Sequence, residues 1–585
     1  MSAHADILTV ITTEIFAALD LPQELARVTV SDRPDLAQFQ CNGAMGAARV
    51  AKKNPREIAA MIVSELEKND IFSKIEIAGP GFINLDVTDS FLENAMADLS
   101  QDERCGLPLS GNNQTIVLDY GGPNIAKPMH VGHLRAAIIG DSIRRMMKFA
   151  GFETLGDVHM GDWGTHMGMI ISEFIRTGQT EDILATDLSD EAQIDDLMKT
   201  LGTMYPLVAA ACREDEARKE EAREATVKLQ NKEAPYYDLL NVIKAASVNG
   251  MRRNYDSLGV HFDLWKGESD VHDYIAPMVE DLKAQNLAME DDEALIVPVA
   301  NDDDKKEIPP LLLYKRDGGV MYGTTDLATI VERVKLYDPA RIIYVVDQRQ
   351  HLHFEQVFRV SQKGGITKPE VELTHAGFGT MNGPDGKPFK TRAGGVMRLE
   401  DLIEMAQDKA MERLGEAALA QDMNEGEKAE VAHKVAIAAI KFADLSNPRL
   451  SDYVFDLDKL TSFEGKTGPY ILYQTVRIQS LLRKAAFDES AAMTFKIHEG
   501  DRALALLLGA FPEAFEASLK QYMPHNLCDY AYRLASAFSR FYGNHHMMSE
   551  PDEALRQSRL ALCALTHKQL VLALSFLGIT VPDRM

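Results

Sequence analysis

The chain has 585 residues, of which 45% are hydrophobic and 26% are charged, and its formal net charge is −26. Domains usually hold about 100 to 200 residues, so this length excludes a single-domain protein, and the composition is that of an ordinary globular one. No stretch approaches the roughly 18 uninterrupted apolar residues of a membrane span. We therefore expect no membrane-spanning segment and no membrane partner.

The start of the chain and the cysteine pattern indicate the cytoplasm. An amphipathic helical pattern containing Asp6 and Glu14 replaces the basic start and apolar centre of an export signal. The cysteines form no CxxC pair, which is typical of reduced thiols and argues against a structural zinc ion. They are Cys41, Cys105, Cys212, Cys528 and Cys563. We expect no protein-bound metal.

The acidic net charge by itself argues against a nucleic-acid partner, because proteins that bind phosphate backbones usually present a basic surface. Much of the acidic excess lies in the runs Glu181–Asp196, Asp215–Glu224 and Glu425–Glu430. Such runs are typical of solvated helix faces and loops. A local basic surface can therefore coexist with the negative total.

The first part of the chain, residues 1–109, predicts a small α+β domain. Helical patterns alternate there with two strand-like pieces, Lys74–Ile77 and Phe82–Val87. The region closes at the polar stretch Ser110–Gln114. A separate folding unit is expected to begin after it.

A strand, a turn and a long helix then open a doubly wound, Rossmann-type α/β unit. Thr115–Asp119 is rich in β-forming residues, and the helical pattern of Pro128–Ala150 ends at Gly151. We expect this unit to span residues 110–399 and to contain a charged helical insertion at about 178–265. Strand signals return later, separated by helical segments as a parallel sheet requires, at Leu295–Val299, Leu311–Tyr314, Arg341–Val346 and Val371–Phe378.

Strand signals nearly vanish after Leu399, so the last third of the chain is predicted to be helical. Apolar residues recur at helical spacing in Ile471–Arg483 and Leu504–Phe515. We divide this part into residues 400–464 and a terminal helical domain, 465–585. The fold class is therefore multidomain α/β.

The sequence His-Val-Gly-His, residues 130–133, lies at the predicted strand-to-helix turn. His130 and His133 are three residues apart and share one helical face. Helix N-terminal amides attract anionic oxygens, and Gly132 lets a nucleotide approach the backbone closely. The two histidines could then donate hydrogen bonds to phosphate oxygens whose charge grows as pyrophosphate leaves.

A second candidate for phosphate binding is the Gly-rich stretch Asp385–Arg392, which follows the last predicted strand. Lys387 and Lys390 lie three residues apart and could reach a triphosphate. The alternative is an ordinary solvated turn. Pro388 follows Gly386-Lys387, so the stretch is not a Walker A loop.

An HxGH turn followed by a lysine loop resembles the signature pair of class I aminoacyl-tRNA synthetases, and longer stretches resemble bacterial-type arginyl-tRNA synthetases. These stretches are Gly79–Asn84, Leu118–Arg135, His159–Thr165, Tyr322–Ala328, Gln350–His353, Gly386–Gly395, Thr467–Tyr473 and the final P-D-R-M. They occur in the family's order and span most of the chain.

The resemblance implies an arginine–tRNA ligase with the class I Rossmann-type core. Such an enzyme activates L-arginine with ATP, as its Mg²⁺ complex, and releases pyrophosphate. It then transfers the arginyl group to the 3′-terminal adenosine of tRNA(Arg) and releases AMP. We expect a cytoplasmic monomer whose partners are tRNA(Arg), L-arginine and ATP.

The resemblance also implies an arginine site. A guanidinium is a planar fork that carboxylates accept in pairs, and Asp119 and Asp326 follow predicted strands, where open α/β sheets bind ligands. The alternative for either residue is a helix cap or turn. The positions carried over for arginine are Asp119, Gly122, Pro123, Asn124, His133, Tyr322, Asp326 and Gln350.

The chain departs from its relatives at two places. Many of them carry serines where this chain has Gly121-Gly122, and residues 387–391 read KPFKT instead of KMSKS. Some family members with such a loop use a lysine just before HxGH, which is Lys127 here. How the triphosphate contacts divide among Lys127, Lys387 and Lys390 stays open.

Contacts to tRNA are implied at both ends of the chain. Gln40 and Asn42 fall where the family's N-terminal domain contacts the tRNA, although both could simply be satisfied within a local turn. Tyr470, Tyr473 and Arg477 share one helical face of the expected anticodon-binding domain. They could stack on an anticodon base, or the tyrosines could pack in the core.

Two other functions are compatible with parts of this pattern. A small-molecule nucleotidyl transferase also carries HxGH on a doubly wound sheet, but it needs no helical tail. A tRNA-binding relative without catalysis would have no reason to retain His130, His133 and Lys390 together.

Overall fold

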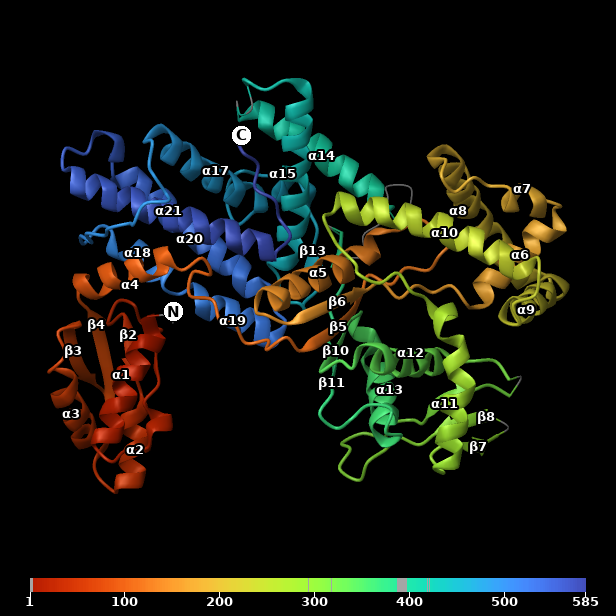
Figure 1. The fold of residues 1–585 in the computed structure, drawn as a ribbon, viewed down its shortest axis with the longest axis horizontal. Coiled ribbons are helices and arrows are strands. Elements are labelled where there is room, and N and C mark those ends of the chain that lie inside the picture. Colours follow the sequence, from red (N-terminus) through yellow and green to blue (C-terminus); the bar gives the residue numbers. More distant parts are fainter. Residues whose placement is uncertain are drawn as a thin grey trace.

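The computed structural model describes residues 4–292, 294–316, 318–383, 385–386, 397–417, 419 and 421–585. Lys387 and Lys390 lie outside these described residues. Figure 1 shows an N-terminal domain (red), a central sheet with its helices, a helical insertion and a C-terminal helical region (blue). Among the described residues, no helix is long and apolar enough to cross a membrane.

The N-terminal domain is a four-stranded antiparallel sheet with four helices. Its strand order is β1-β2-β4-β3, with β1 at Val28–Val30, β2 at Phe39–Cys41, β3 at Phe72–Ala78 and β4 at Phe82–Val87. The helices are α1 (His4–Ala18), α2 (Gly43–Ala51), α3 (Pro55–Leu66) and α4 (Asp89–Gln101). The sequence predicted β3 and β4 but not β1 and β2, which are three residues long and too short to show an alternating pattern.

The central sheet is parallel, with the order β11-β10-β5-β6. The chain enters it at the inner strand β5, moves to one side and then returns to the other, so the strand order reverses beside β5. Ligands bind open α/β sheets at such a switch point. The strands are β5 (Thr115–Tyr120), β6 (Glu153–Asp157), β10 (Arg341–Val345) and β11 (Glu372–His375).

The helices of this region carry the residues that surround the carboxyl edge of the sheet. They are α5 (Leu134–Phe149), α6 (Thr165–Arg176), α11 (His272–Ala284), α12 (Tyr322–Tyr337) and α13 (His351–Lys363). The predicted helix after the first strand is confirmed, although it begins at Leu134 and not at Pro128, and it stops before Gly151, whose φ of 92° favours glycine. The strand β6 was not predicted, because Glu153–Asp157 has few β-branched residues and an internal glycine.

Two of the strands predicted for the parallel sheet lie elsewhere. β8 (Ala294–Val297) and β9 (Leu311–Tyr314) form a separate antiparallel sheet with β7 (Met289–Asp291), so their assignment to the parallel sheet was wrong. Residues 298–310, which connect β8 to β9, contain no helix that could serve as a parallel crossover.

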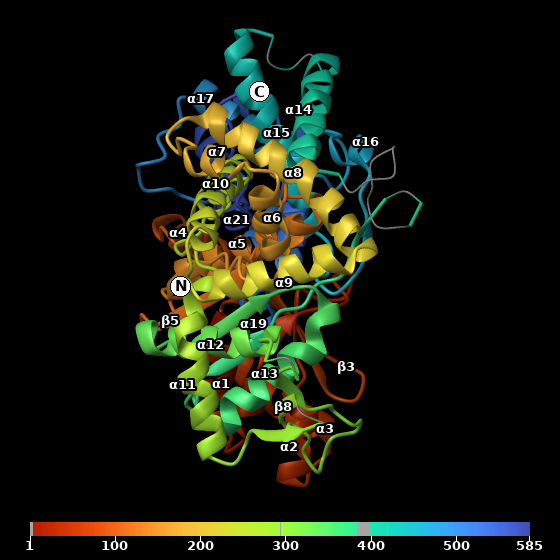
Figure 2. The ribbon, with the colours of Figure 1, turned by 90° about the vertical axis from the view of Figure 1, so that its right-hand side faces the viewer.

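The charged insertion is helical, as predicted. It consists of α7 (Thr180–Leu184), α8 (Glu191–Glu214), α9 (Glu216–Gln230) and α10 (Tyr236–Ser257). In Figures 1 and 2 the insertion lies between α14 (Leu399–Glu416) at the top and the β7–β9 sheet at the bottom. It therefore adjoins both the sheet domain and the C-terminal helices.

The last third is almost entirely helical, as predicted. The predicted helical run Leu504–Phe515 divides into α18 and α19 at Gly509-Ala510, because Pro512 opens a new helix. A short parallel pair, β12 (Met381–Asn382) with β13 (Tyr453–Val454), joins this part to the sheet domain. The helices after α14 are α15 (Glu425–Leu445), α16 (Leu457–Leu460), α17 (Gly468–Lys484), α18 (Arg502–Leu508), α19 (Phe511–Gln521), α20 (His525–Asn544) and α21 (Glu553–Phe576).

A buried ion pair fastens α5 to the C-terminal helices. Arg135 Nε lies 3.0 Å from Asp444 Oδ2 on α15, and both side chains are buried. Arg135 Nη1 also donates to Ser451 O at 3.2 Å. Removing one partner of such a pair would leave an uncompensated buried charge, which disfavours separation of the two regions.

Candidate active site

The histidine turn lies between β5 and α5 as one turn of 3-10 helix, Val131–His133. The amide of Gly132 donates to His130 Nδ1 at 3.1 Å, and the amide of His130 donates to His133 Nδ1 at 3.2 Å. The two rings stack with their centroids 3.9 Å apart. Because each Nδ1 accepts a hydrogen bond, the proton of each neutral ring lies on Nε2.

Both rings are neutral at physiological pH. Burial lowers the pKa of His133 to about 3, and the neighbouring His130 and Lys127 add to this effect. Burial and the charge of Lys127 also lower the pKa of His130. The turn therefore offers two Nε2–H donors without bringing a positive charge of its own.

Residues just after the lysine segment are bonded to the histidine turn. Val131 N–H donates to Met397 O at 3.1 Å, and Leu399 N–H donates to Met129 O at 3.0 Å. Residues 387–396 themselves lie outside the described residues, but their C-terminal flank is thus fixed beside HxGH.

Lys127 makes a contact that the sequence did not indicate. Its Nζ lies 4.0 Å above the ring of Tyr205, which belongs to the insertion helix α8. Lys127 also lines a cavity of about 710 Å³ between α8, α10 and α14, together with Arg398. In this conformation the ammonium group lies against Tyr205.

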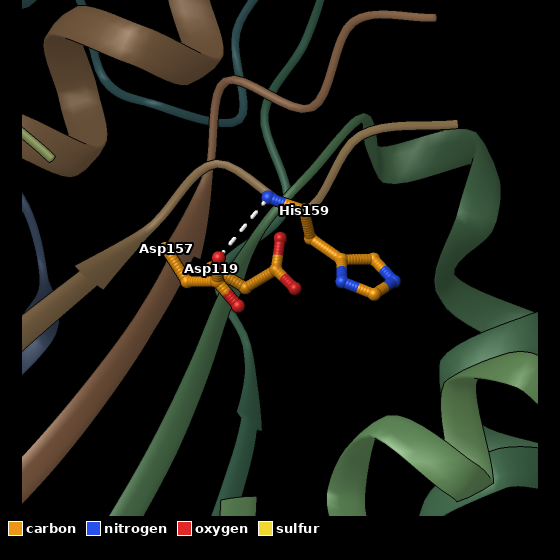
Figure 3. A group of neighbouring side chains, drawn as sticks. All are labelled: Asp119, Asp157 and His159. Carbon is orange, nitrogen blue, oxygen red and sulfur yellow. Dashed lines mark hydrogen bonds between the residues drawn. The ribbon is translucent and has the colours of Figure 1, made fainter. Parts of the chain in front are cut away.

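Two aspartates meet at the carboxyl ends of β5 and β6 (Figure 3). Asp119 and Asp157 are direct neighbours in the parallel register. Arg333 Nη2 on α12 donates to Asp119 Oδ2 and Asp157 Oδ2, both at 2.6 Å. Burial raises the pKa of Asp119, whereas for Asp157 the charges of Arg333 and His159 outweigh burial and lower the pKa.

His159 completes a group whose geometry could suit a metal ion. Its ring and the carboxylates of Asp119 and Asp157 place one ligand atom each within 4.8 Å of one another, the one such group among the described residues. The guanidinium of Arg333 already bridges both carboxylates, so the cation at this position is an arginine side chain. The group therefore does not support a resident metal.

A second set of polar side chains surrounds the first half of α12. Asp326 Oδ2 lies 2.5 Å from His353 Nε2 on α13, and Tyr322 is 68% exposed at the start of α12. Burial alone lowers the pKa of His353, but the hydrogen bond and charge of Asp326 outweigh burial and raise it. Gln350 lies exposed just before α13.

Glu268 is a site candidate that the sequence did not reveal. Burial, assisted by the charges of Asp162 and Asp326 and opposed by that of His159, raises its pKa to about 7. Its charge also acts on Tyr322. The segment around Glu268 has no motif or periodicity, and its bridges to Asp157 on β6 and to Met160 bring it to the sheet edge.

The Gly-Gly turn explains one departure from the relatives. Gly121 has a φ of 88°, and a Cβ atom there would lie 2.9 Å from the hydroxyl of Tyr255. A serine at this position would be strained and crowded. After this turn, the amide of Gly161 donates to Pro123 O at 3.3 Å, while Gly122 and Asn124 are exposed.

Four of the five expected tRNA residues, Gln40, Tyr470, Tyr473 and Arg477, have local partners. Gln40 lies on β2, where its Nε2 donates to Asn84 Oδ1 at 2.8 Å, and Asn42 precedes α2 without capping it. On α17, Arg477 lies 4.2 Å above the ring of Tyr542. The rings of Tyr470 and Tyr532 are 5.9 Å apart, and those of Phe463 and Tyr473 are 6.4 Å apart.

Comparisons with known proteins identify the family. A model described as "tRNA synthetases class I (R), catalytic domain" matches residues 95–457. The chain belongs to the arginyl-tRNA synthetase family. Models described as "Arginyl tRNA synthetase N terminal domain" and "DALR anticodon binding domain" match residues 5–87 and 471–585.

Relatives match over the full length. An arginine–tRNA ligase of Maricaulis maris is 46% identical over 595 residues and covers 100% of both chains. One of Alkaliphilus oremlandii is 46% identical over 577 residues, with 98% of each chain covered. The crystal structure of arginyl-tRNA synthetase from Plasmodium falciparum superimposes with a TM-score of 0.81 at 26% identity and covers 100% of each chain.

These matches confirm three expectations from the sequence. The chain is a bacterial-type member of the arginyl-tRNA synthetase family, its fold is that of a class I synthetase with N-terminal and C-terminal helical additions, and its activity is that of an arginine–tRNA ligase. ATP as a substrate follows from this class.

The pKa values of two histidines of the site should be shifted in opposite directions. A lowered pKa keeps His133 neutral down to strongly acidic pH, whereas a raised pKa keeps His353 protonated through about pH 6. Ring ¹⁵N shifts in histidine-labelled protein, assigned with His133→Gln and His353→Gln, should show Nε2–H for His133 and an imidazolium for His353. Titration of His133 between pH 6 and 7 would contradict the proposed geometry of the turn.

Proposed function

We propose that the charging of tRNA(Arg) with arginine takes place at the carboxyl edge of the parallel sheet, with ATP at the histidine turn and arginine along α12. The observation that carries the proposal is the pair of backbone hydrogen bonds to the histidine Nδ1 atoms, which leaves both Nε2–H groups free to donate. Preorganised donors stabilise charge that grows in a transition state.

Phosphate binding combines the turn with lysines. Gly132 leaves the backbone open to ATP, and Lys387 and Lys390 carry the family's lysine motif. Lys127 adds a third cation if it exchanges its contact with Tyr205 for a phosphate oxygen. ATP enters as its Mg²⁺ complex, in which the metal is bound mainly by phosphates and water.

Binding of the arginine side chain uses the acidic groups that Arg333 does not neutralise. Asp326 and Glu268 hold the guanidinium beside Tyr322 and Gln350, because their carboxylates match its planar fork. The reacting end of the substrate must lie near the histidine turn. Asp119, at the end of the strand that leads to this turn, therefore binds the α-ammonium group together with Asn124 and the Gly122-Pro123 backbone.

The reaction then needs positioning more than a protein nucleophile. The carboxylate of arginine attacks the α-phosphorus of ATP, the bond to the β-phosphate oxygen breaks, and pyrophosphate leaves. His130 and His133 stabilise the phosphate oxygens as that charge grows. The 2′-hydroxyl of the terminal adenosine next attacks the carbonyl carbon of the adenylate, and AMP leaves with the electron pair of the broken bond.

The remaining parts of the proposal concern tRNA and the cell. Gln40 and Asn42 contact tRNA from the N-terminal domain, and the face of α17 with Tyr470, Tyr473 and Arg477 receives an anticodon base. The enzyme works as a cytoplasmic monomer. All five cysteines are free and buried, which is compatible with a reducing compartment.

The two other functions fit less well. A small-molecule nucleotidyl transferase has no use for residues 471–585, which match an anticodon binding domain. A binding protein without catalysis has no use for two histidine tautomers set by backbone amides. Arginine-dependent exchange of pyrophosphate into ATP distinguishes all three functions.

The arginine pocket predicts a pH-dependent Michaelis constant. Glu268 is half protonated near its pKa of about 7, and a bound guanidinium favours its charged form. The KM for arginine should therefore fall about tenfold between pH 6 and 8, while that for ATP follows the pH less closely. Glu268→Gln should raise the KM for arginine and remove this pH dependence.

Asp326→Asn should raise the KM for arginine far more than that for ATP. Equal effects on both substrates would remove Glu268 and Asp326 from the pocket.

The anticodon face predicts a loss of tRNA affinity without a loss of stability. Arg477→Gln removes a charge that lies against Tyr542, so tRNA affinity should fall and its salt dependence should flatten while the melting temperature hardly changes. Lys484→Gln, on the last turn of the same helix, is the control for loss of one charge. Equal tRNA affinity over a salt series for Arg477→Gln and the unmodified protein would exclude Arg477 from the tRNA surface.

A further inference from the structure

Arg333 is a buried arginine next to the proposed arginine pocket. It lies on α12 with 1% of its surface exposed, and a single nitrogen, Nη2, lies 2.6 Å from one oxygen of Asp119 and 2.6 Å from one of Asp157. The ring of Tyr344 on β10 lies 5.4 Å from the centre of the guanidinium. Arg333 therefore joins α12 to the ends of β5 and β6.

The two carboxylates require a cation. Asp119 and Asp157 are register neighbours on parallel strands, and like charges at such positions repel strongly when buried. Burial alone lowers the pKa of Arg333, but Asp119 and Asp157 outweigh burial and raise it well above its ordinary value. Arginine suits this position because its side chain stays charged when buried, unlike that of lysine.

Arg333 shares its helix face with the proposed arginine-binding residues. Tyr322, Asp326, Thr329 and Arg333 are four, three and four residues apart, a spacing that places them on one side of α12. Thr329 Oγ1 lies 3.4 Å from His159 Nε2, and Asp326 contacts His353. The face thus runs from the exposed Tyr322 to the buried Arg333, past both groups of acidic residues.

A substrate that carries a guanidinium could in principle bind either acidic group. Without Arg333, Asp119 and Asp157 would present two carboxylates beside His159, in a geometry that also suits a divalent cation (Figure 3). If the substrate guanidinium bound there, the side chain of arginine would lie at the end of β5, which leads to the histidine turn. The reacting carboxylate would then point away from that turn. The pocket needs a way to block this binding mode.

We propose that Arg333 is a positioning and specificity residue: it fills the Asp119–Asp157 pair as a resident guanidinium, so that substrate arginine binds in one orientation only. The substrate guanidinium is left to Asp326 and Glu268, and Asp119 keeps one oxygen for the α-ammonium group. This inference rests on the arginine pocket proposed above.

Arg333→Ala tests the inference in exchange assays with the full-length protein. Because arginine bound in the misplaced mode occupies the enzyme without reacting, kcat and the KM for arginine should fall together, about tenfold or more, while kcat/KM for arginine and the KM for ATP change little. The loss of rate should therefore appear at saturating arginine. Millimolar guanidinium chloride should restore the rate there, because the free ion can refill the Asp119–Asp157 pair.

Two further variants separate positioning from stability. Arg144→Ala removes another buried arginine, which lies 3.2 Å from Asp141 on α5, and should lower the melting temperature. It should change neither the ratio of the KM for arginine to that for ATP nor the response of the rate to guanidinium chloride. Arg333→Lys keeps a cation and serves if the alanine variant does not fold. Its KM for arginine should be intermediate.

The inference would be overturned by a folded Arg333→Ala or Arg333→Lys protein whose KM for arginine, relative to that for ATP, is unchanged and whose rate does not respond to guanidinium chloride. Failure of the arginine pocket itself would have another signature. In that case Asp326→Asn would leave the KM for arginine unchanged, whatever the Arg333 variants do.

Discussion

Two backbone hydrogen bonds fix the histidine turn, the proposed ATP site, against the segment that leads into α14. They join Met129–Val131, at the histidine turn, to Met397–Leu399, just after the lysine segment. Because both hydrogen bonds use main-chain groups, they do not depend on which side chains these two segments carry. The ATP site that we propose at the histidine turn rests on this contact, since it fixes the backbone on one side of the turn.

In the proposed site, the charges of the protein are complementary to those of the two substrates. The histidine turn carries neutral donors, which we propose face a polyanionic nucleotide while lysines supply the cations. Arg333 pairs with Asp119 and Asp157. In the proposed pocket, Glu268 and Asp326 are left to the side chain of substrate arginine. The net charge of −26 describes the whole surface and gives no information about this local balance.

The parts of the structure that local patterns encode could be predicted from the sequence. HxGH at a strand-to-helix turn, the helix after it and the helical last third follow from short-range spacing, and family resemblance supplied the candidate residues. Contacts between distant segments could not be predicted. Lys127 meets Tyr205 on the insertion, and Arg333 meets Asp119 and Asp157, more than a hundred residues away. Glu268 stands in no motif and becomes a candidate only through burial beside Asp326.

The central claim is that the histidine turn and the lysine segment act on the same phosphates. A double-mutant cycle with His130→Ala and Lys390→Ala, read as the rate of arginyl-adenylate formation in single turnovers, tests it directly. Residues that contact one group in the transition state are non-additive. We predict that the double variant is slowed clearly less than the product of the two single effects. Independent effects, whose product equals the loss in the double variant, would contradict this account.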